Sequence, residues 1–331
     1  MAKYGLPYMG SKDGICDELI RIFPKCENFY DLFGGGFSVT HAMLVNRSKD
    51  FSEFHYNEIR PGLCELIKDT IDGKYNYEVF KPKFIDRERF FAEKDKNAYI
   101  KICWSFGNSG KNYLFSKEIE PYKKSMHQAV VFNEFDDLAK EVFGCSGFRE
   151  GYSINSRRLI LRSRIEQFRK TKNIPQSLVR FLPKKTQNFR QLQQLEQLER
   201  LEQLERLQQL ERLEQLERLQ QLEQLKFTNV SYDEVEIKPN SIIYCDPPYH
   251  GTAKYDAEFN HRKFLDWADR QINPVFISEY KIEDKRFKPL FKIQKRSMLS
   301  SYKKIKVKNE FVFGNKSAID HLYSLRGKNA V

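Results

Sequence analysis

The chain has 331 residues, of which 40% are hydrophobic and 14% aromatic, enough for a globular core. No apolar stretch approaches the roughly 20 residues that span a membrane, and residues 1–5 lack the apolar segment of a secretory signal. The net charge of +12 favours an anionic partner. The six cysteines show no Cys-x-x-Cys spacing and the histidines are not clustered, which predicts reduced, buried thiols, no bound metal and a cytoplasmic location.

A glycine-rich turn near the N-terminus is the first candidate ligand site. We expect a strand at residues 28–33, a turn at 34–36 and a helix at 37–44. Glycines let a ligand approach the backbone closely, although the Gly-x-Gly-x-x-Gly spacing of dinucleotide sites is absent. A second expected strand, residues 54–56, leads to Glu58. An acid about 20 residues after the glycines is placed to bind both hydroxyls of a ribose.

The middle of the chain is mixed in character. Residues 71–190 combine aromatic, asparagine and basic positions, for example at 104–113. Such side chains suit the reading of base edges or a wedge into a base stack, and they equally suit an ordinary polar loop. Ser153 is expected to cap a helix that has Arg157 and Arg158 near its start, where they could contact phosphates.

Residues 191–225 form a low-complexity repeat of the Leu-Glu-Gln-Leu-Glu-Arg type, with leucine at every third position. All four residue types favour helix, which predicts a helical segment over residues 191–226. A step of three residues turns about 300°, so the leucines wind around the helix and form no coiled-coil seam. Two interpretations stay open: a tolerated spacer, or an arm for self-association.

An acid, a rigid turn and an aromatic ring follow the apolar run at residues 242–245. The run predicts a buried strand, and two prolines end it. The carboxyl end of such a strand is where open α/β sheets bind ligands. The four residues of this turn are Asp246, Pro247, Pro248 and Tyr249.

A further strand is expected at residues 227–230, and residues 273–280 resemble another core strand of the family described below. Residues 303–313 alternate between apolar positions and lysines, which predicts a strand or hairpin with one buried face.

These motifs resemble those of the Dam-like, D12 class adenine-N6 DNA methyltransferases. Residues 246–249 match the Asp-Pro-Pro-Tyr motif, residues 8–12 resemble the N-terminal aromatic-x-Gly-x-Lys motif, and residues 31–36 resemble the glycine loop. The chain departs from the pattern at Phe37, where many relatives have another glycine. The resemblance covers residues 4–70 and 227–315, with weaker correspondence between them.

The resemblance implies a doubly wound, Rossmann-like α/β core that binds S-adenosylmethionine, with a helical target-recognition insertion and the leucine-rich helical repeat. The expected divisions are a cofactor half at 1–70, the insertion at 71–190, the repeat at 191–226 and a catalytic half at 227–331. The residues implied to hold the cofactor are Tyr8, Lys12, Asp31, Phe33, Gly34, Gly35, Glu58 and Asp246.

The chemistry of the reaction explains the Asp-Pro-Pro-Tyr turn. Adenine N6 is a poor nucleophile because its lone pair is delocalised into the ring. If the Asp246 carboxylate and the Pro247 carbonyl accept the two N6 hydrogens, the lone pair is directed at the methyl group, and neither a metal nor a covalent intermediate is needed. Pro248 completes the rigid turn, and Tyr249 can stack on a base flipped out of the duplex. The expected partner is therefore double-stranded DNA, without a membrane.

Two alternatives remain at this point. The same fold could methylate cytosine N4, although those enzymes more often have serine in place of Asp246. The chain could also be a catalytically silent DNA-binding or scaffold protein that assembles through the repeat. The intact set of Lys12, Glu58, Asp246 and Tyr249 favours an enzyme.

Overall fold

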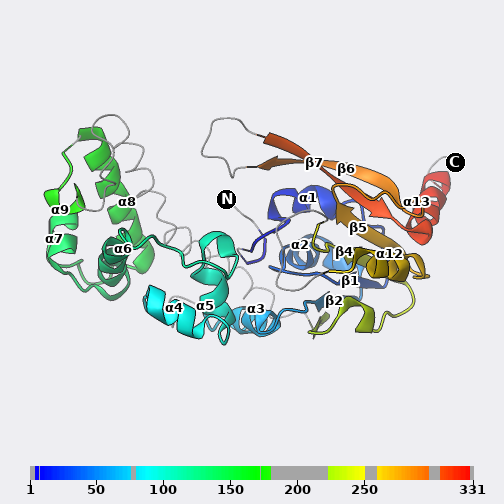
Figure 1. Cartoon of the computed structure of the whole chain (residues 1–331), viewed down its shortest axis with the longest axis horizontal. Helices are drawn as coiled ribbons and strands as arrows, with labels where there is room; N and C mark the ends of the chain where they lie inside the picture. Colours follow the sequence, from blue (N-terminus) through cyan, green and yellow to red (C-terminus); the bar gives the residue numbers. More distant parts are fainter. Residues whose placement is uncertain are drawn as a thin grey trace. The chain divides into compact units, whose positions relative to one another are not determined.

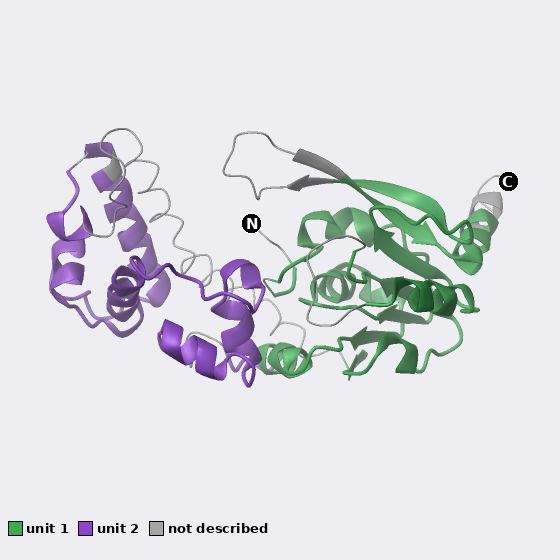
Figure 2. Cartoon of the chain, in the orientation of Figure 1, with its two compact units in different colours: residues 1–71, 216–331 green, residues 72–215 purple. Residues whose placement is uncertain are grey.

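The structure is a computed structural model that describes residues 4–6, 8–75, 80–171, 173–179, 223–249, 259–297 and 306–328. The chain forms two compact units, one of residues 1–71 with 216–331 and one of residues 72–215 (Figure 2). Both ends of the chain therefore build the first unit. Residues 191–222 of the repeat lie outside the described residues, so the helix expected there stays a prediction.

The first unit contains a seven-stranded sheet in the order β3-β2-β1-β4-β5-β7-β6 (Figure 1). Its strands are β1 Asn28–Asp31, β2 Glu53–Asn57, β3 Leu225–Thr228, β4 Ser241–Cys245, β5 Val275–Glu279, β6 Lys288–Ser297 and β7 Lys306–Gly314. Strands β1 to β5 pair in parallel, whereas β7 is antiparallel to both β5 and β6. The predicted α/β class is confirmed as a mixed fold with a mostly parallel sheet. The strand order reverses between β1 and β4, and in open α/β sheets ligands bind outside the carboxyl ends of the strands at such a point.

Helices pack on both faces of this sheet. They are α1 Cys16–Leu19, α2 Ser38–Arg47, α3 Leu63–Ile71, α12 His261–Asp269 and α13 Lys316–Lys328. On one face, Phe264 and Trp267 of α12 pack on buried residues of β1, β4, β5 and β7. On the other face, the ring of Phe23 contacts the rings of Phe29, Tyr244 and Phe276 at centroid distances of 5.3, 5.5 and 5.4 Å. Since both faces are covered, the central strands are apolar without alternation.

The second unit is helical in its described part. Its helices are α4 Arg87–Glu93, α5 Ala98–Cys103, α6 Glu120–His127, α7 Asp137–Phe143, α8 Ile154–Thr171 and α9 Gln176–Val179. A buried cluster that includes Phe90, Trp104 and Phe115 packs around α4 and α5. That this unit recognises the target stays a prediction.

The predicted cap of α8 is confirmed, but its arginines have other partners than expected. The backbone N–H of Ser156 donates to Oγ of Ser153 at 3.1 Å, directly before the helix begins. The guanidinium of Arg157 donates to the carbonyl of Val130 at 3.3 Å. Arg158 is only 7% exposed and donates to Asn155. Both arginines are thus engaged within the unit, which argues against the phosphate contact expected of them.

Two strand predictions need correction. Strand β3 begins at Leu225, so the last two residues of the predicted helical segment, Leu225 and Lys226, are extended. They pair with Phe54 and His55 of β2, and this pairing outweighs helix propensity. The expectation of one buried face over residues 303–313 is also wrong at residues 310–313, where residues of both faces are buried, while residues 303–305 lie outside the described residues.

Strand β7 lies between β5 and β6, so both of its edges are paired. The adjacent residues Val312 and Phe313 point to opposite faces, and both are buried. The strand therefore reads as a continuous apolar run at this end.

All six cysteines are free, as predicted, but only Cys16, Cys64 and Cys245 are buried, and Cys145 is exposed. Among the described residues, no helix is both long and apolar enough to cross a bilayer.

Candidate active site

Acidic residues gather at the carboxyl edge of the parallel strands. Asp31 is the last residue of β1, Glu58 directly follows β2, and Asp246 directly follows β4. Because parallel strands end at a common edge, three distant parts of the sequence place a carboxylate there. Asp31 and Asp246 flank the point at which the strand order reverses.

The buried ammonium of Lys12 joins the N-terminal motif to the Asp-Pro-Pro-Tyr turn. Lys12 is 4% exposed, and its Nζ lies 2.7 Å from Oδ1 of Asp246. The same Nζ donates to the hydroxyl of Tyr249 at 2.8 Å and lies 4.7 Å from the centroid of its ring. Pro247 is buried between the acid and the tyrosine, and Pro248 is partly buried. The structure thus brings together residues that the sequence placed in two separate motifs.

A third acid, Glu310 of β7, completes this group and was missed in the sequence analysis. Its Oε1 accepts a hydrogen bond from the hydroxyl of Tyr249 at 2.8 Å and lies 3.2 Å from Nζ of Lys12. Glu310 is 1% exposed. It shares a face of the sheet with Val312. In the sequence, Glu310 falls in the same alternating phase as Lys306 and Lys308, which was expected to be exposed, so no local signal marked it.

The electrostatics of this group fix its protonation states. Burial opposes the charge on Lys12, but the carboxylates of Asp246 and Glu310 outweigh that penalty and raise the Lys12 pKa above its ordinary value. Burial, followed by the same two carboxylates, raises the pKa of Tyr249 well above its ordinary value. At neutral pH the lysine is therefore a cation and the tyrosine keeps its proton. The hydrogen bonds run in one direction, from Lys12 to Tyr249 to Glu310.

The glycine turn is closed by backbone hydrogen bonds and crowded by tyrosine rings. The N–H of Gly34 donates to the carbonyl of Asn57 at 2.9 Å, and the N–H of Gly35 donates to Oε2 of Glu58 at 2.9 Å. Gly35 has a φ of +48°, which favours glycine. A Cβ on Gly34 would lie 2.1 Å from the ring of Tyr56, so no larger residue fits there. The turn therefore needs its first two glycines.

Tyr8 lies against the same turn and is held by Arg60. A Cβ on Gly35 would lie 2.9 Å from the Tyr8 ring. The guanidinium of Arg60 donates to the hydroxyl of Tyr8 at 2.5 Å, and its carbon lies 5.3 Å from the ring centroid. The backbone N–H of Arg60 donates to Oε1 of Glu58 at 3.0 Å. Arg60 was not predicted as a site residue, because a basic residue after a strand is too common to be a signal.

Glu58 is a buried acid whose charge is partly compensated. It is 7% exposed, and burial raises its pKa, while the N–H groups of Arg60 and Gly35 act in the opposite direction. Its two oxygens face the turn from the end of β2.

Asp31 is the least compensated acid at this edge. It is 1% exposed, and Thr40 of α2 donates to its Oδ2 at 2.8 Å. Among the described residues, Oδ1 has no hydrogen-bond partner. Burial raises the pKa of Asp31 to about 7, and the charges of Asp246 and Glu58 add to this effect. A buried carboxylate oxygen without a donor suits a ligand that brings a positive charge or an N–H group.

Phe33 lies apart from these groups. Its ring contacts the rings of Tyr232, Phe259 and Phe264 at centroid distances of 5.4, 5.7 and 5.5 Å. This places Phe33 against the hydrophobic core beside α12.

Phe37, the departure from the family's pattern, adopts a backbone conformation that favours glycine. Its φ is +68° and its ψ is 13°, directly before α2 begins. The side chain is fully buried, and its ring contacts the rings of Tyr56 and Phe227 at centroid distances of 5.3 and 6.1 Å. Packing of the buried Phe37 ring therefore stabilises a loop conformation that glycine would adopt without strain.

Comparison with models of protein families gives one match that covers more than half of the chain. Residues 8–144 and 199–276 match the D12 class N6 adenine-specific DNA methyltransferases. The chain belongs to this family. It is an adenine-specific DNA methyltransferase, which transfers a methyl group from S-adenosylmethionine to N6 of a flipped adenine. No curated protein matches the chain significantly.

The family match also concerns the two alternatives that the sequence left open, cytosine-N4 methylation and a silent DNA-binding or scaffold protein. It spans Lys12, Glu58 and the Asp-Pro-Pro-Tyr turn, and it favours adenine N6 over cytosine N4 and an enzyme over a silent scaffold. Strand β7 with Glu310 lies beyond the matched residues.

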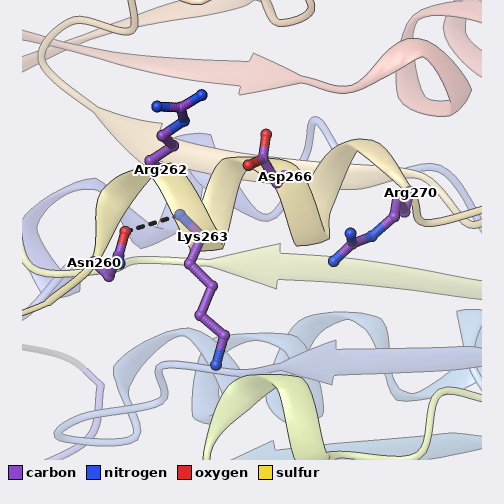
Figure 3. Close-up of a pocket in the computed structure, with 5 residues that line it drawn as sticks. All are labelled: Asn260, Arg262, Lys263, Asp266 and Arg270. Carbon is purple, nitrogen blue, oxygen red and sulfur yellow. Dashed lines mark hydrogen bonds between the residues drawn. The ribbon is translucent and has the colours of Figure 1, made fainter.

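A pocket of the methyltransferase on α12 does not have the features of this site. It is lined by Asn260, Arg262, Lys263, Asp266 and Arg270 (Figure 3). The side chain of Asn260 accepts a hydrogen bond from the N–H of Lys263 at 2.9 Å and so caps the helix. Lys263 pairs with Asp233 at 2.7 Å, and Asp266 pairs with Arg286 at 2.7 Å. The charges of Lys263 and Asp266 are thus paired at the surface of the protein. In the described part of the chain, no three His, Cys, Asp or Glu side chains are grouped as metal ligands.

Proposed function

We propose that this methyltransferase modifies an adenine flipped out of double-stranded DNA, with Asp246, Pro247, Pro248 and Tyr249 as its catalytic turn. The observation that carries the proposal is the contact of Lys12 with both Asp246 and Tyr249 at the carboxyl edge of the sheet. This contact joins the two motifs expected on either side of the reacting atoms. It lies at the reversal of the strand order, where such sheets bind their ligands.

The residues at this edge fit S-adenosylmethionine. Glu58 offers two carboxylate oxygens for the ribose hydroxyls, and Asp31 offers a buried oxygen without a described donor for a positive charge. Gly34 and Gly35 form the turn beside these acids, and the ring of Tyr8 lies against Gly35. Lys12 and Asp246 complete the residues assigned to the cofactor site. Phe33, which was also expected there, packs against the hydrophobic core. When bound, the cofactor would supply a methyl group on a sulfonium, whose sulfur keeps the bonding electron pair and leaves as a neutral thioether.

The protein's part in the reaction is to activate N6. One N6 hydrogen is donated to the Asp246 carboxylate and the other to the Pro247 carbonyl, so the nitrogen lone pair is freed for attack. A carboxylate has about four lone-pair sites, so Asp246 can accept from N6 and keep its contact with Lys12. After the N–C bond forms, Asp246 accepts the proton that the nitrogen loses. Tyr249 replaces the stacking lost by the flipped base, worth about 1–3 kcal/mol.

We assign target recognition to the helical unit of residues 72–215, because it is inserted between the cofactor half and the catalytic half. Self-association through residues 191–225 and a cytoplasmic location stay predictions.

The test is methyl transfer from tritiated S-adenosylmethionine to unmethylated duplex DNA, followed by digestion to nucleosides. We expect the label in N6-methyladenine. Label in N4-methylcytosine would contradict the assigned target atom. No incorporation together with no cofactor binding would contradict the proposal as a whole.

A further inference from the structure

We propose that Glu310 is a positioning residue for methyl transfer, which acts through the hydroxyl of Tyr249 and the ammonium of Lys12. The inference rests on the proposed function of the Asp-Pro-Pro-Tyr turn and extends it to a strand that lies beyond the family match. No motif of the sequence marks this residue.

The antiparallel register of β7 brings Glu310 to the carboxyl edge of the parallel strands. Phe311 of β7 pairs with Glu279, the last residue of β5. Glu310 therefore lies one residue beyond the end of β5, level with the carboxyl ends of the parallel strands. Its side chain shares a face with Val312, which pairs with Ser278, and Ser278 shares a hydrogen bond of 2.8 Å with Tyr244. This is the face on which Lys12 lies.

The ring of Tyr249 is fixed at two points by these contacts. Its hydroxyl accepts from Lys12 and donates to Glu310, both at 2.8 Å. Its ring meets the ring of Tyr280 edge-on, at a centroid distance of 4.8 Å. Because the hydroxyl stays protonated, the bond to the Glu310 carboxylate is charge-assisted and roughly twice as strong as a neutral one. A ring held in this way needs no reorientation when a base stacks on it.

Glu310 also sets how Lys12 is shared. The ammonium lies between two carboxylates, 2.7 Å from Asp246 and 3.2 Å from Glu310. With Glu310 present, Lys12 has a second carboxylate partner and can keep its position when Asp246 accepts one of the N6 hydrogens. Without it, Lys12 would pair with Asp246 alone, which would weaken Asp246 as an acceptor for the base.

The experiment is a double-mutant cycle of E310Q and Y249F, measured as the single-turnover rate of methyl transfer to DNA in the full chain. We expect E310Q to slow transfer by about tenfold to 100-fold, the range caused by small misplacements of reacting groups. The Kd of S-adenosylmethionine should stay within about twofold, a factor worth under 0.5 kcal/mol. In the Y249F background the effect of E310Q should fall to about threefold or less, because the shared hydrogen bond is already absent.

A matched cycle of E310Q with Y30F is the control. Tyr30 is a fully buried tyrosine of the sheet, and its hydroxyl accepts from the backbone N–H of Lys238, away from Glu310. The two effects should multiply. E310D, which keeps the charge but shortens the side chain by one methylene, should be slow as well. It provides the test if E310Q does not fold.

The outcomes separate the two claims. Near-wild-type transfer by both E310Q and E310D, in a wild type that methylates adenine, would overturn the inference and leave the proposed function intact. Equal slowing by E310Q with and without the Tyr249 hydroxyl would also overturn it. A wild type that transfers no methyl group would overturn both.

Discussion

Lys12 donates a hydrogen bond of 2.8 Å to the hydroxyl of Tyr249, which lies 237 residues further along the chain. The bond ties the segment before α1 to the turn after β4. Asp246 and Glu310 hold the same ammonium at 2.7 and 3.2 Å, so the four side chains form one network around a buried cation. The predictions below test this network and the adjoining glycine turn.

Replacement of Asp246 by alanine should abolish most of the activity and keep the fold. The acceptor of one N6 hydrogen is lost, and removal of such a group lowers the rate by about 100-fold to 1,000-fold. Lys12 keeps Glu310 as its partner, so no buried charge is left alone. Single-turnover transfer and circular dichroism would check both parts. Near-wild-type turnover of D246A would contradict the assigned mechanism.

Replacement of Lys12 by methionine should destabilise the fold strongly. The partly buried Asp246 and the buried Glu310 would then lose their shared cation, and breaking a buried ion pair in this way costs about 3–5 kcal/mol. The free energy of unfolding in urea measures the loss. The control is K238M, because Lys238 is also paired, with Glu53 at 2.5 Å, but its side chain is 51% exposed. That variant should lose less than about 1 kcal/mol.

The titration of Asp31 should appear in the stability of the ligand-free protein. Its pKa is raised from 3.8 to about 7 in the folded chain, so between these values the folded state binds more protons than the unfolded state. Stability should therefore fall as the pH rises from about 4 to 7 and then level off. The D31N variant should lack this contribution. We expect the unfolding free energy of wild type minus that of D31N to decrease over this range. A difference that is constant with pH would contradict the shift.

At position 37, glycine should give a more stable protein than alanine, which is the reverse of the usual order. Both substitutions remove a buried ring, which costs about 3–5 kcal/mol for a change to alanine. Alanine also keeps the strain of the left-handed backbone, about 1–2 kcal/mol, whereas glycine relieves it. F37G should thus be more stable than F37A by about 1 kcal/mol. Equal stability, or a more stable F37A, would show that the loop relaxes to another conformation.

Replacement of Glu58 by glutamine should weaken cofactor binding. Hydrogen bonds to a charged group contribute about 1.5–3 kcal/mol, so the Kd of S-adenosylmethionine should rise by roughly tenfold to 100-fold. E53Q is the matched control, since Glu53 begins the same strand at its opposite end. Isothermal titration calorimetry should show an unchanged Kd for E53Q. A loss of affinity in both variants would point to damage to β2 and not to a ribose contact.

The sequence predicted the elements whose signal is local. The run of β-branched and aromatic residues before Asp246 is strand β4, and the prolines end it where expected. The glycine turn lies between β1 and α2, although β1 ends at Asp31, two residues before the predicted end. These features depend on residues adjacent in the chain, so composition and spacing are enough to find them.

The contacts between distant segments could not be predicted in the same way. Lys12 and Asp246 were both candidates, but only the sheet order shows that they form an ion pair. Glu310 was missed because its place at the reacting edge depends on the antiparallel register of β7. Strand β3 was placed two residues too late because the composition of the repeat continues through Leu225, while pairing with β2 decides where the strand begins.

The pairing of β1 with β4 has a consequence for the synthesis of the protein. Asn28 lies beside Ser241 in the centre of the sheet, and the whole helical unit is made between them. On the ribosome, β1 and β2 emerge with one side of β1 unpaired until β4 has been translated. Contacts of such long sequence separation form slowly, so the nascent N-terminal half exposes an open sheet edge for most of translation. This half is therefore the part of the chain most in need of protection against aggregation before the last strands arrive.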